Sequence, residues 1–130
     1  MQQTVTMKEF GRILLVVDHL AELASLTPHF TDLPEGWKVH VSQNPADALC
    51  HMDQVHCDIV FVDLKEGPVA STQFLHEVWA RHPETIRFLL ADAMEPDLMV
   101  TCALGPHQFL QKPLDSTIVR SAVERAQLVH

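Results

Sequence analysis

The sequence predicts one α/β domain built on a doubly wound sheet of five parallel strands. Two segments, 12–18 and 58–63, are apolar almost throughout and rich in β-branched residues, as strands covered on both faces must be. Segments with helical periodicity lie between the strand-like segments, so that strand and helix alternate five times. With 130 residues, the chain is long enough to close one hydrophobic core.

The other three predicted strands are less uniform than the first and third. Residues 37–42 alternate between apolar and polar side chains, and residues 86–91 form another apolar run. Residues 107–111 give the weakest strand signal, which fits the edge of a sheet. In such a sheet, ligands bind beyond the carboxyl ends of the strands, where the chain order reverses. The candidate site is therefore expected at those strand ends.

Each predicted helix has an apolar face, and most have a capping signal. The first, from Leu20 to about Thr31, contains Pro28, which should kink or shorten it. Asn44 and Asp115 are the expected N-caps of the second and last helices. The residues expected to face the core from the second to the fifth helix are Ala48, Leu49 and Met52; Phe74, Leu75, Val78 and Trp79; Leu98, Met99, Cys102 and Ala103; and Ile118, Val119, Ala122, Val123 and Ala126.

Composition limits the classes of function. The formal net charge of −8 argues against direct binding of nucleic acid by this domain, because that binding needs Lys and Arg to replace counterions. An odd count of three cysteines does not suggest a disulfide framework. No apolar run is long enough to span a bilayer, and the first residues lack a secretory signal pattern. We therefore expect a cytoplasmic protein without membrane contact, with an extension at 1–11 and the domain at 12–130.

Nine histidines raise the question of a zinc site. The pairs at 50–51 and 56–57, Cys-His and His-Cys, bracket a short turn, but the Cys-x2–4-Cys spacing typical of zinc loops is absent. A small buried cysteine with exposed histidines is the preferred interpretation. A glycine-rich phosphate loop is also absent among the four glycines, so a nucleotide-binding or flavin-binding role lacks its main signature.

Two acids and a lysine are expected to meet at the strand ends. Asp18 follows the first strand, Asp63 ends the third and Lys112 follows the fifth. Carboxylates that converge repel each other unless a cation lies between them, and Mg²⁺ suits such oxygen ligands. A lysine in the same place can neutralise a phosphoryl group. A structural ion pair that caps the sheet would explain the same pattern, and the pattern leaves both interpretations open.

Four segments together resemble the receiver domain of response regulators in two-component signalling. They are ILLVVDH at 13–19, DIVFVDL at 58–64, RFLLADA at 87–93 and LGPHQFLQKPLD at 104–115. The last, in which Gly, an aromatic residue and Lys-Pro precede a capped helix, is the most specific. The resemblance covers about residues 12–127 and implies the five-stranded (βα)5 fold of CheY-like, flavodoxin-like receivers.

The resemblance also implies roles for individual residues. Asp63 would be the phosphoacceptor, attacking as a carboxylate nucleophile. Asp18, Asp63 and the backbone carbonyl of Lys65 would bind Mg²⁺, and Lys112 would pair with the phosphoryl oxygens. Phe109 would occupy the aromatic switch position of the last strand. The chain would not be an enzyme beyond slow self-phosphorylation and dephosphorylation.

The sequence departs from the receiver pattern near this site. Val17 stands at the first of the two positions where receivers usually carry adjacent acids, so only Asp18 remains. His19 follows Asp18 where another acid is common. Ala91 replaces the hydroxyl residue that ends the fourth strand, which removes a hydrogen bond worth about 1.5–3 kcal/mol to a charged group. Asp92, where a small residue is usual, would either repel the phosphoryl group or supply a metal-side acid.

His19 and the segment after Asp63 also differ from the usual pattern. The preferred interpretation of His19 is a solvated residue that precedes the first helix; the alternative is a protonated imidazole that hydrogen-bonds a phosphoryl group. Glu66-Gly67 stands where receivers usually have Met-Pro. These departures weaken the expected metal binding and the expected transmission of a signal.

Three functions are therefore kept. The first is a receiver phosphorylated on Asp63 by a histidine kinase, a phosphotransfer protein or a small acyl phosphate. The second is a pseudo-receiver that binds partner proteins without phosphate, and the third is an enzyme or cofactor binder on the same fold. In the first two cases, the resemblance implies pairing into a homodimer through residues 96–129.

Overall fold

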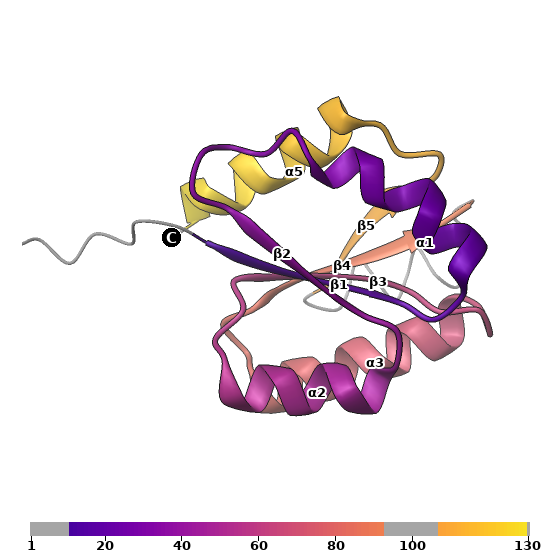
Figure 1. Ribbon diagram of the computed structural model, residues 1–130. Helices are drawn as coiled ribbons and strands as arrows, with labels where there is room; N and C mark the ends of the chain where they lie inside the picture. Colours follow the sequence, from indigo (N-terminus) through magenta and orange to yellow (C-terminus); the bar gives the residue numbers. More distant parts are fainter. Residues whose placement is uncertain (1–10, 93–106, 130) are drawn as a thin grey trace, which may run out of the picture.

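A computed structural model describes residues 11–92 and 107–129 (Figure 1). Five parallel strands form one sheet in the order β2-β1-β3-β4-β5, which confirms the predicted fold class and the edge position of the last strand. The chain order reverses between β1 and β3, so their carboxyl ends flank the crevice where such sheets bind ligands. The strands are β1 (Arg12–Val17), β2 (Lys38–Ser42), β3 (Ile59–Asp63), β4 (Ile86–Ala91) and β5 (Gln108–Gln111).

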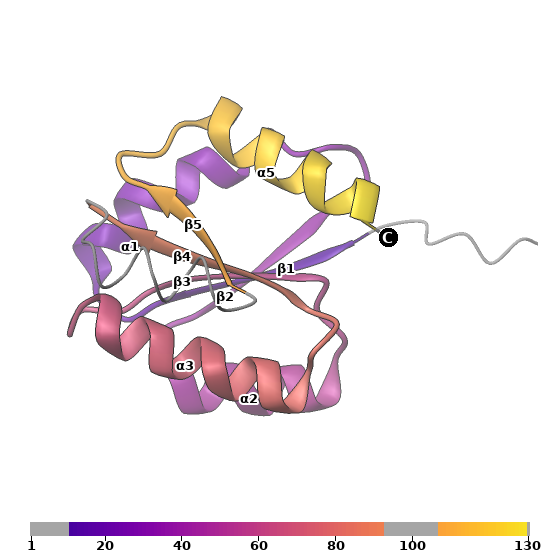
Figure 2. The same cartoon turned by 180° about the vertical axis from the view of Figure 1, so that it is seen from behind.

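Helices cover both faces of the sheet. α1 and α5 lie on one face, and α2 and α3 lie on the other (Figures 1 and 2). In the described part of the chain, no helix is long and apolar enough to cross a membrane. The predicted fourth helix, with Leu98, Met99, Cys102 and Ala103, lies outside the described residues. The helices are α1 (Leu20–Leu26), the 3-10 helix η1 (Thr27–Phe30), α2 (Pro45–Gln54), α3 (Pro68–Arg81) and α5 (Ser116–Val129).

The sheet divides the core into two clusters because successive strand residues point to opposite faces. In β1, Ile13, Leu15 and Val17 pack with α1 and α5, whereas Leu14 and Val16 pack with α2 and α3. Every residue of β3 is buried, as a central strand requires. Aromatic rings reinforce the first cluster: Phe61 stacks on Phe88 at 4.8 Å and meets Phe30 edge-on at 5.0 Å.

Most of the helix predictions are confirmed, and two residues are placed differently. The first helix is shortened as Pro28 predicted, because α1 ends at Leu26 and the chain continues as η1. Trp79 was expected in the core but is 45% exposed, and Ile118 is 36% exposed. Both lie at the margin of an apolar stripe whose central residues already fill the contact with the sheet. Those central residues are Phe74, Leu75 and Val78 in α3 and Val119, Ala122, Val123 and Ala126 in α5.

Asn44→Ala is expected to lower the free energy of unfolding by about 1 kcal/mol. The Asn44 side chain accepts hydrogen bonds from the backbone N–H groups of Ala46 (2.8 Å) and Asp47 (3.1 Å), which otherwise have no partner within the helix. Urea unfolding measures the change. Gln43→Ala, at the exposed neighbouring position, is the control and should change stability by less than about 0.5 kcal/mol. Equal losses for the two variants would contradict the capping role.

Candidate functional site

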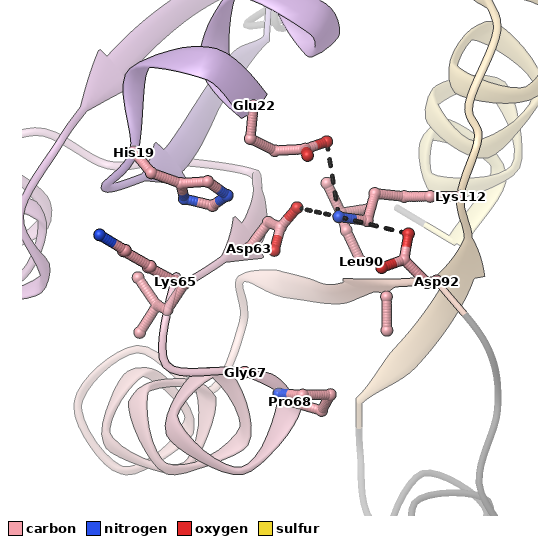
Figure 3. A pocket seen from close by; sticks show the side chains of 11 residues that line it. His19, Glu22, Asp63, Lys65, Gly67, Pro68, Leu90, Asp92 and Lys112 are labelled. Carbon is pink, nitrogen blue, oxygen red and sulfur yellow. Dashed lines mark hydrogen bonds and ion pairs between the residues drawn. The ribbon is translucent and has the colours of Figure 1, made fainter.

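A cavity of about 370 Å³ lies beyond the carboxyl ends of the strands (Figure 3). The loops that follow β1, β3, β4 and β5 contribute its walls, so residues far apart in the sequence meet there. This is the edge at which the sequence predicted a site. The lining residues are His19, Glu22, Asp63, Leu64, Lys65, Gly67, Pro68, Leu90, Ala91, Asp92 and Lys112.

An ion pair between Asp63 and Lys112 stands at the centre of the cavity. The Lys112 Nζ donates to Asp63 Oδ2 at 2.6 Å, and both side chains are about nine-tenths buried. Glu22 Oε2 lies 3.4 Å from the same Nζ, and Asp92 Oδ1 lies 3.8 Å from it. Figure 3 shows the three carboxylates turned toward the one ammonium group. The site therefore carries an excess of negative charge.

The pKa values of the central pair reflect this crowding. Burial raises the pKa of Asp63 above its usual range, although the hydrogen bond and the charge of Lys112 act in the opposite direction. Burial alone would lower the pKa of Lys112, but Asp63, Glu22 and Asp92 outweigh it and raise that pKa. Lys112 thus stays charged, while the fold disfavours the charged form of Asp63. An added cation would relieve that penalty.

Asp18 does not line the cavity. Its Oδ1 accepts a hydrogen bond from the backbone N–H of Lys65 at 2.7 Å and lies 3.2 Å from Nδ1 of His19. Asp18 therefore ties the loop after β1 to the loop after β3. Ser71 helps to fix the second loop, because its hydroxyl accepts a hydrogen bond from the N–H of Leu64 at 3.0 Å. Gly67 allows the turn into α3 with a φ of 111°, which favours glycine.

Three potential metal ligands, one of them Asp63, converge in the cavity. One donor atom each from His19, Glu22 and Asp63 lies within 4.8 Å of the other two. Glu22 was not among the residues predicted for the site. It follows His19 by three residues and lies in the first turn of α1, so the two side chains share one side of the helix start. That spacing was the signal that could have found it.

The structure corrects the placement of Val17. Its side chain is fully buried in the cluster beneath α1 and α5, and it does not reach the cavity. An acid at position 17 would point into this core, because Val17 still belongs to β1 and shares the face of Ile13 and Leu15. The departure that matters for the cavity is therefore His19, which lines it.

The remaining candidate residues lie at different distances from the cavity. Ala91 is buried and lines it, so the end of β4 presents a methyl group there. Asp92 lines it too, with a side chain that is 91% exposed. Phe109 is half-buried against the cluster beneath α2 and α3 and is not a lining residue.

The donor set differs from the one expected for Mg²⁺. Asp63 is in place, but Asp18 is held by Lys65 and His19, and an imidazole nitrogen stands among the converging atoms. Mg²⁺ prefers oxygen ligands in near-octahedral geometry. The set of two carboxylates and one imidazole fits an ion that accepts both nitrogen and oxygen.

The sequence matches no protein-family model, and none of the curated proteins matches it significantly. Solved structures, in contrast, resemble it over nearly the whole chain. The signal receiver domain of an HD domain-containing protein from Pseudomonas fluorescens Pf-5 has a TM-score of 0.77 at 22% identity, covering 97% of this chain and 93% of that one. Chemotaxis protein CheY4 of Vibrio cholerae has a TM-score of 0.74 at 18% identity, covering 90% and 98%. A CheY-like receiver domain protein from Methanospirillum hungatei JF-1 has a TM-score of 0.73 at 17% identity, covering 92% and 95%.

Proposed function

We propose that this chain, which has the fold of response-regulator receiver domains, acts as a receiver in two-component signalling with Asp63 as its phosphoacceptor. The observation that carries the proposal is the Asp63–Lys112 pair in an open cavity at the carboxyl ends of the strands. A carboxylate beside a fixed ammonium group can attack a phosphoryl donor while the ammonium group neutralises the transferred oxygens.

The transfer makes one bond and breaks another. A carboxylate oxygen of Asp63 attacks the phosphorus of a phosphohistidine or an acyl phosphate, and the bond between phosphorus and the donor breaks. The product is an acyl phosphate on Asp63, and the donor leaves with the electron pair of the broken bond. Lys112 shifts from its bond with Asp63 toward the phosphoryl oxygens. A divalent cation, when bound, would neutralise the remaining charge, and Mg²⁺ is proposed to bind weakly in this role.

The proposed partners are a histidine kinase or a phosphotransfer protein, as for receivers in general. A homodimer through residues 96–129 is part of the proposal; of this surface, the structure describes β5 and α5. A pseudo-receiver that works without phosphate is the second candidate. It is favoured by the methyl group of Ala91 at the cavity, which offers no hydroxyl for a phosphoryl oxygen.

A phosphoryl mimic tests the choice between the two candidates. Beryllofluoride is expected to shift the amide resonances of Asp63, Lys65 and Lys112, because it occupies the cavity in place of a phosphoryl group. The spectra are recorded with Mg²⁺ and, separately, with Mn²⁺. Asp63→Asn should abolish the response, and Asp92→Asn, at the exposed rim of the cavity, should retain it. A wild-type spectrum that stays unchanged with both ions would favour the pseudo-receiver.

A further inference from the structure

We infer that the cavity binds a divalent transition-metal ion through the imidazole of His19 and the carboxylates of Glu22 and Asp63, in preference to Mg²⁺. This inference deepens the proposed function, because the ion would share Asp63 with the phosphoryl group and would lie beside it. It assigns to His19 and Glu22 a role that the resemblance to receivers does not supply.

Distance is the first argument. The three donor atoms lie within 4.8 Å of one another. Two ligand atoms of a tetrahedral zinc ion are about 3.4 Å apart at bond lengths of about 2.1 Å. Side-chain rotations that bring the donor atoms about 1–1.5 Å closer to one another would place all three on one ion. The backbone is already fixed, since Val17 and Asp63 are paired in the sheet and His19 leads directly into α1.

The orientation of His19 is the second argument. Its Nδ1 lies 3.2 Å from Asp18 Oδ1, and Figure 3 shows the ring turned toward Asp63. Metal-binding histidines characteristically donate the second ring N–H to a carboxylate, which fixes the tautomer and leaves the other nitrogen free to bind. Asp18 is itself held by the N–H of Lys65 at 2.7 Å. Asp18 is thus a positioning residue for His19.

Charge and ligand type decide which ion fits. Asp63, Glu22 and Asp92 face a single ammonium group, so a dication is electrostatically favoured. Imidazole suits zinc, nickel, copper and iron, whereas Mg²⁺ takes carboxylates, carbonyls and water. Three protein ligands in an open cavity leave positions for water or a phosphoryl oxygen, as in zinc sites that keep an open position.

A pair of histidines outside the cavity offers a comparison. His40 and His51 stack with ring centroids 3.9 Å apart and an interplanar angle of 7°. The nitrogen lone pairs of parallel rings lie in separate parallel planes, so they do not converge on one ion. His40 therefore provides a control for adventitious zinc binding.

Calorimetric titration with Zn²⁺ and with Mg²⁺ tests the inference on the whole chain. Zn²⁺ is expected to bind one site at least about 100-fold more tightly than Mg²⁺. His19→Asp should weaken Zn²⁺ binding at least about tenfold and strengthen Mg²⁺ binding, because the donor set becomes all carboxylate. Glu22→Gln should weaken Zn²⁺ binding, and His40→Gln should leave it unchanged. His19→Gln is a second substitution of the same histidine and should also weaken Zn²⁺ binding. Circular dichroism verifies that each variant is folded.

NMR spectra locate the bound Zn²⁺ independently of the affinities. Zn²⁺ should shift the imidazole nitrogen resonances of His19, and those of the His40–His51 pair should stay in place. Unchanged Zn²⁺ affinity in both folded His19 variants, or an equal loss in His40→Gln, would overturn the inference. A beryllofluoride response with Mg²⁺ but no Zn²⁺ at His19 would defeat the metal assignment alone. Zn²⁺ at His19 without any beryllofluoride response would defeat phosphoryl acceptance alone.

Discussion

Lys112→Met is expected to lower the free energy of unfolding by about 2–3 kcal/mol at neutral pH. Removing one partner of a buried ion pair costs about 3–5 kcal/mol, because the other charge is left uncompensated. The cavity is open to water, which reduces this cost for Asp63 and Glu22. Urea unfolding measures the loss. Lys65→Met, an exposed lysine of the same cavity, is the control and should stay within about 0.5 kcal/mol of the wild type.

Asp63→Asn should act in the opposite direction and stabilise the protein, because Lys112 keeps the carboxylates of Glu22 and Asp92 as partners. Burial raises the pKa of Asp63, so the folded chain binds its proton more tightly than the unfolded chain does. Stability therefore falls as the pH rises from the usual pKa of an aspartate through the raised one, and at neutral pH the charged carboxylate is a net cost. The double variant with Lys112→Met should recover most of the loss caused by Lys112→Met alone. A double variant as unstable as Lys112→Met would show that packing of the lysine stem, and not charge, explains the loss.

The pH dependence separates these explanations further. The penalty of Lys112→Met should shrink as the solution is acidified through the pKa of Asp63, because a protonated carboxyl group needs no cation. A packing defect would persist at every pH. The stabilisation expected of Asp63→Asn would be consistent with a functional carboxylate, because the fold would then be more stable without its charge.

The sheet could be predicted because the apolar pattern of each central strand is visible within a few consecutive residues. A strand covered on both faces must be apolar at nearly every position, and β1 and β3 satisfy this condition in the sequence itself. The edge strand β5 was also evident, since its exposed residues weaken the apolar run. Trp79 shows the limit of a helical stripe, because periodicity gives the direction of a side chain but not the width of the surface that covers it.

The site was only partly predictable because it depends on side-chain conformations and loop contacts that the sequence does not show. Asp63 and Lys112 were identified from the strand ends, and they do form a pair. Val17 was misplaced by matching a motif without counting strand faces, although its separation of two from Leu15 already assigns it to the core. Glu22 was missed although the predicted helix start at Leu20 was right and its separation of three residues from His19 was visible in the sequence. The turn of Asp18 toward Lys65 is a tertiary contact between two loops.

Acidification from pH 6.5 to pH 4 is expected to destabilise the protein by up to about 3 kcal/mol through His107. This side chain is 4% exposed, and its Nδ1 accepts a hydrogen bond from Arg87 Nε at 3.2 Å, an arrangement that requires a neutral ring. Burial, together with His76 and Arg87, lowers the pKa of His107 to about 4. Between pH 6.5 and pH 4, the unfolded chain therefore binds a proton at His107 that the folded chain does not bind. Stability falls as the pH falls for this reason.

The measurement compares the wild type with His107→Gln by urea unfolding across this interval. The glutamine carbonyl can still accept the hydrogen bond from Arg87, so the variant removes the titration and keeps the contact. Asp63 contributes with the opposite sign, because its raised pKa favours folding as the pH falls. That contribution is common to both proteins and cancels in their difference. His76→Gln, whose ring lies 4.8 Å from that of His107, should retain most of the pH dependence. If His107→Gln lost stability as steeply as the wild type between pH 6.5 and pH 4, the acid sensitivity would belong to another group.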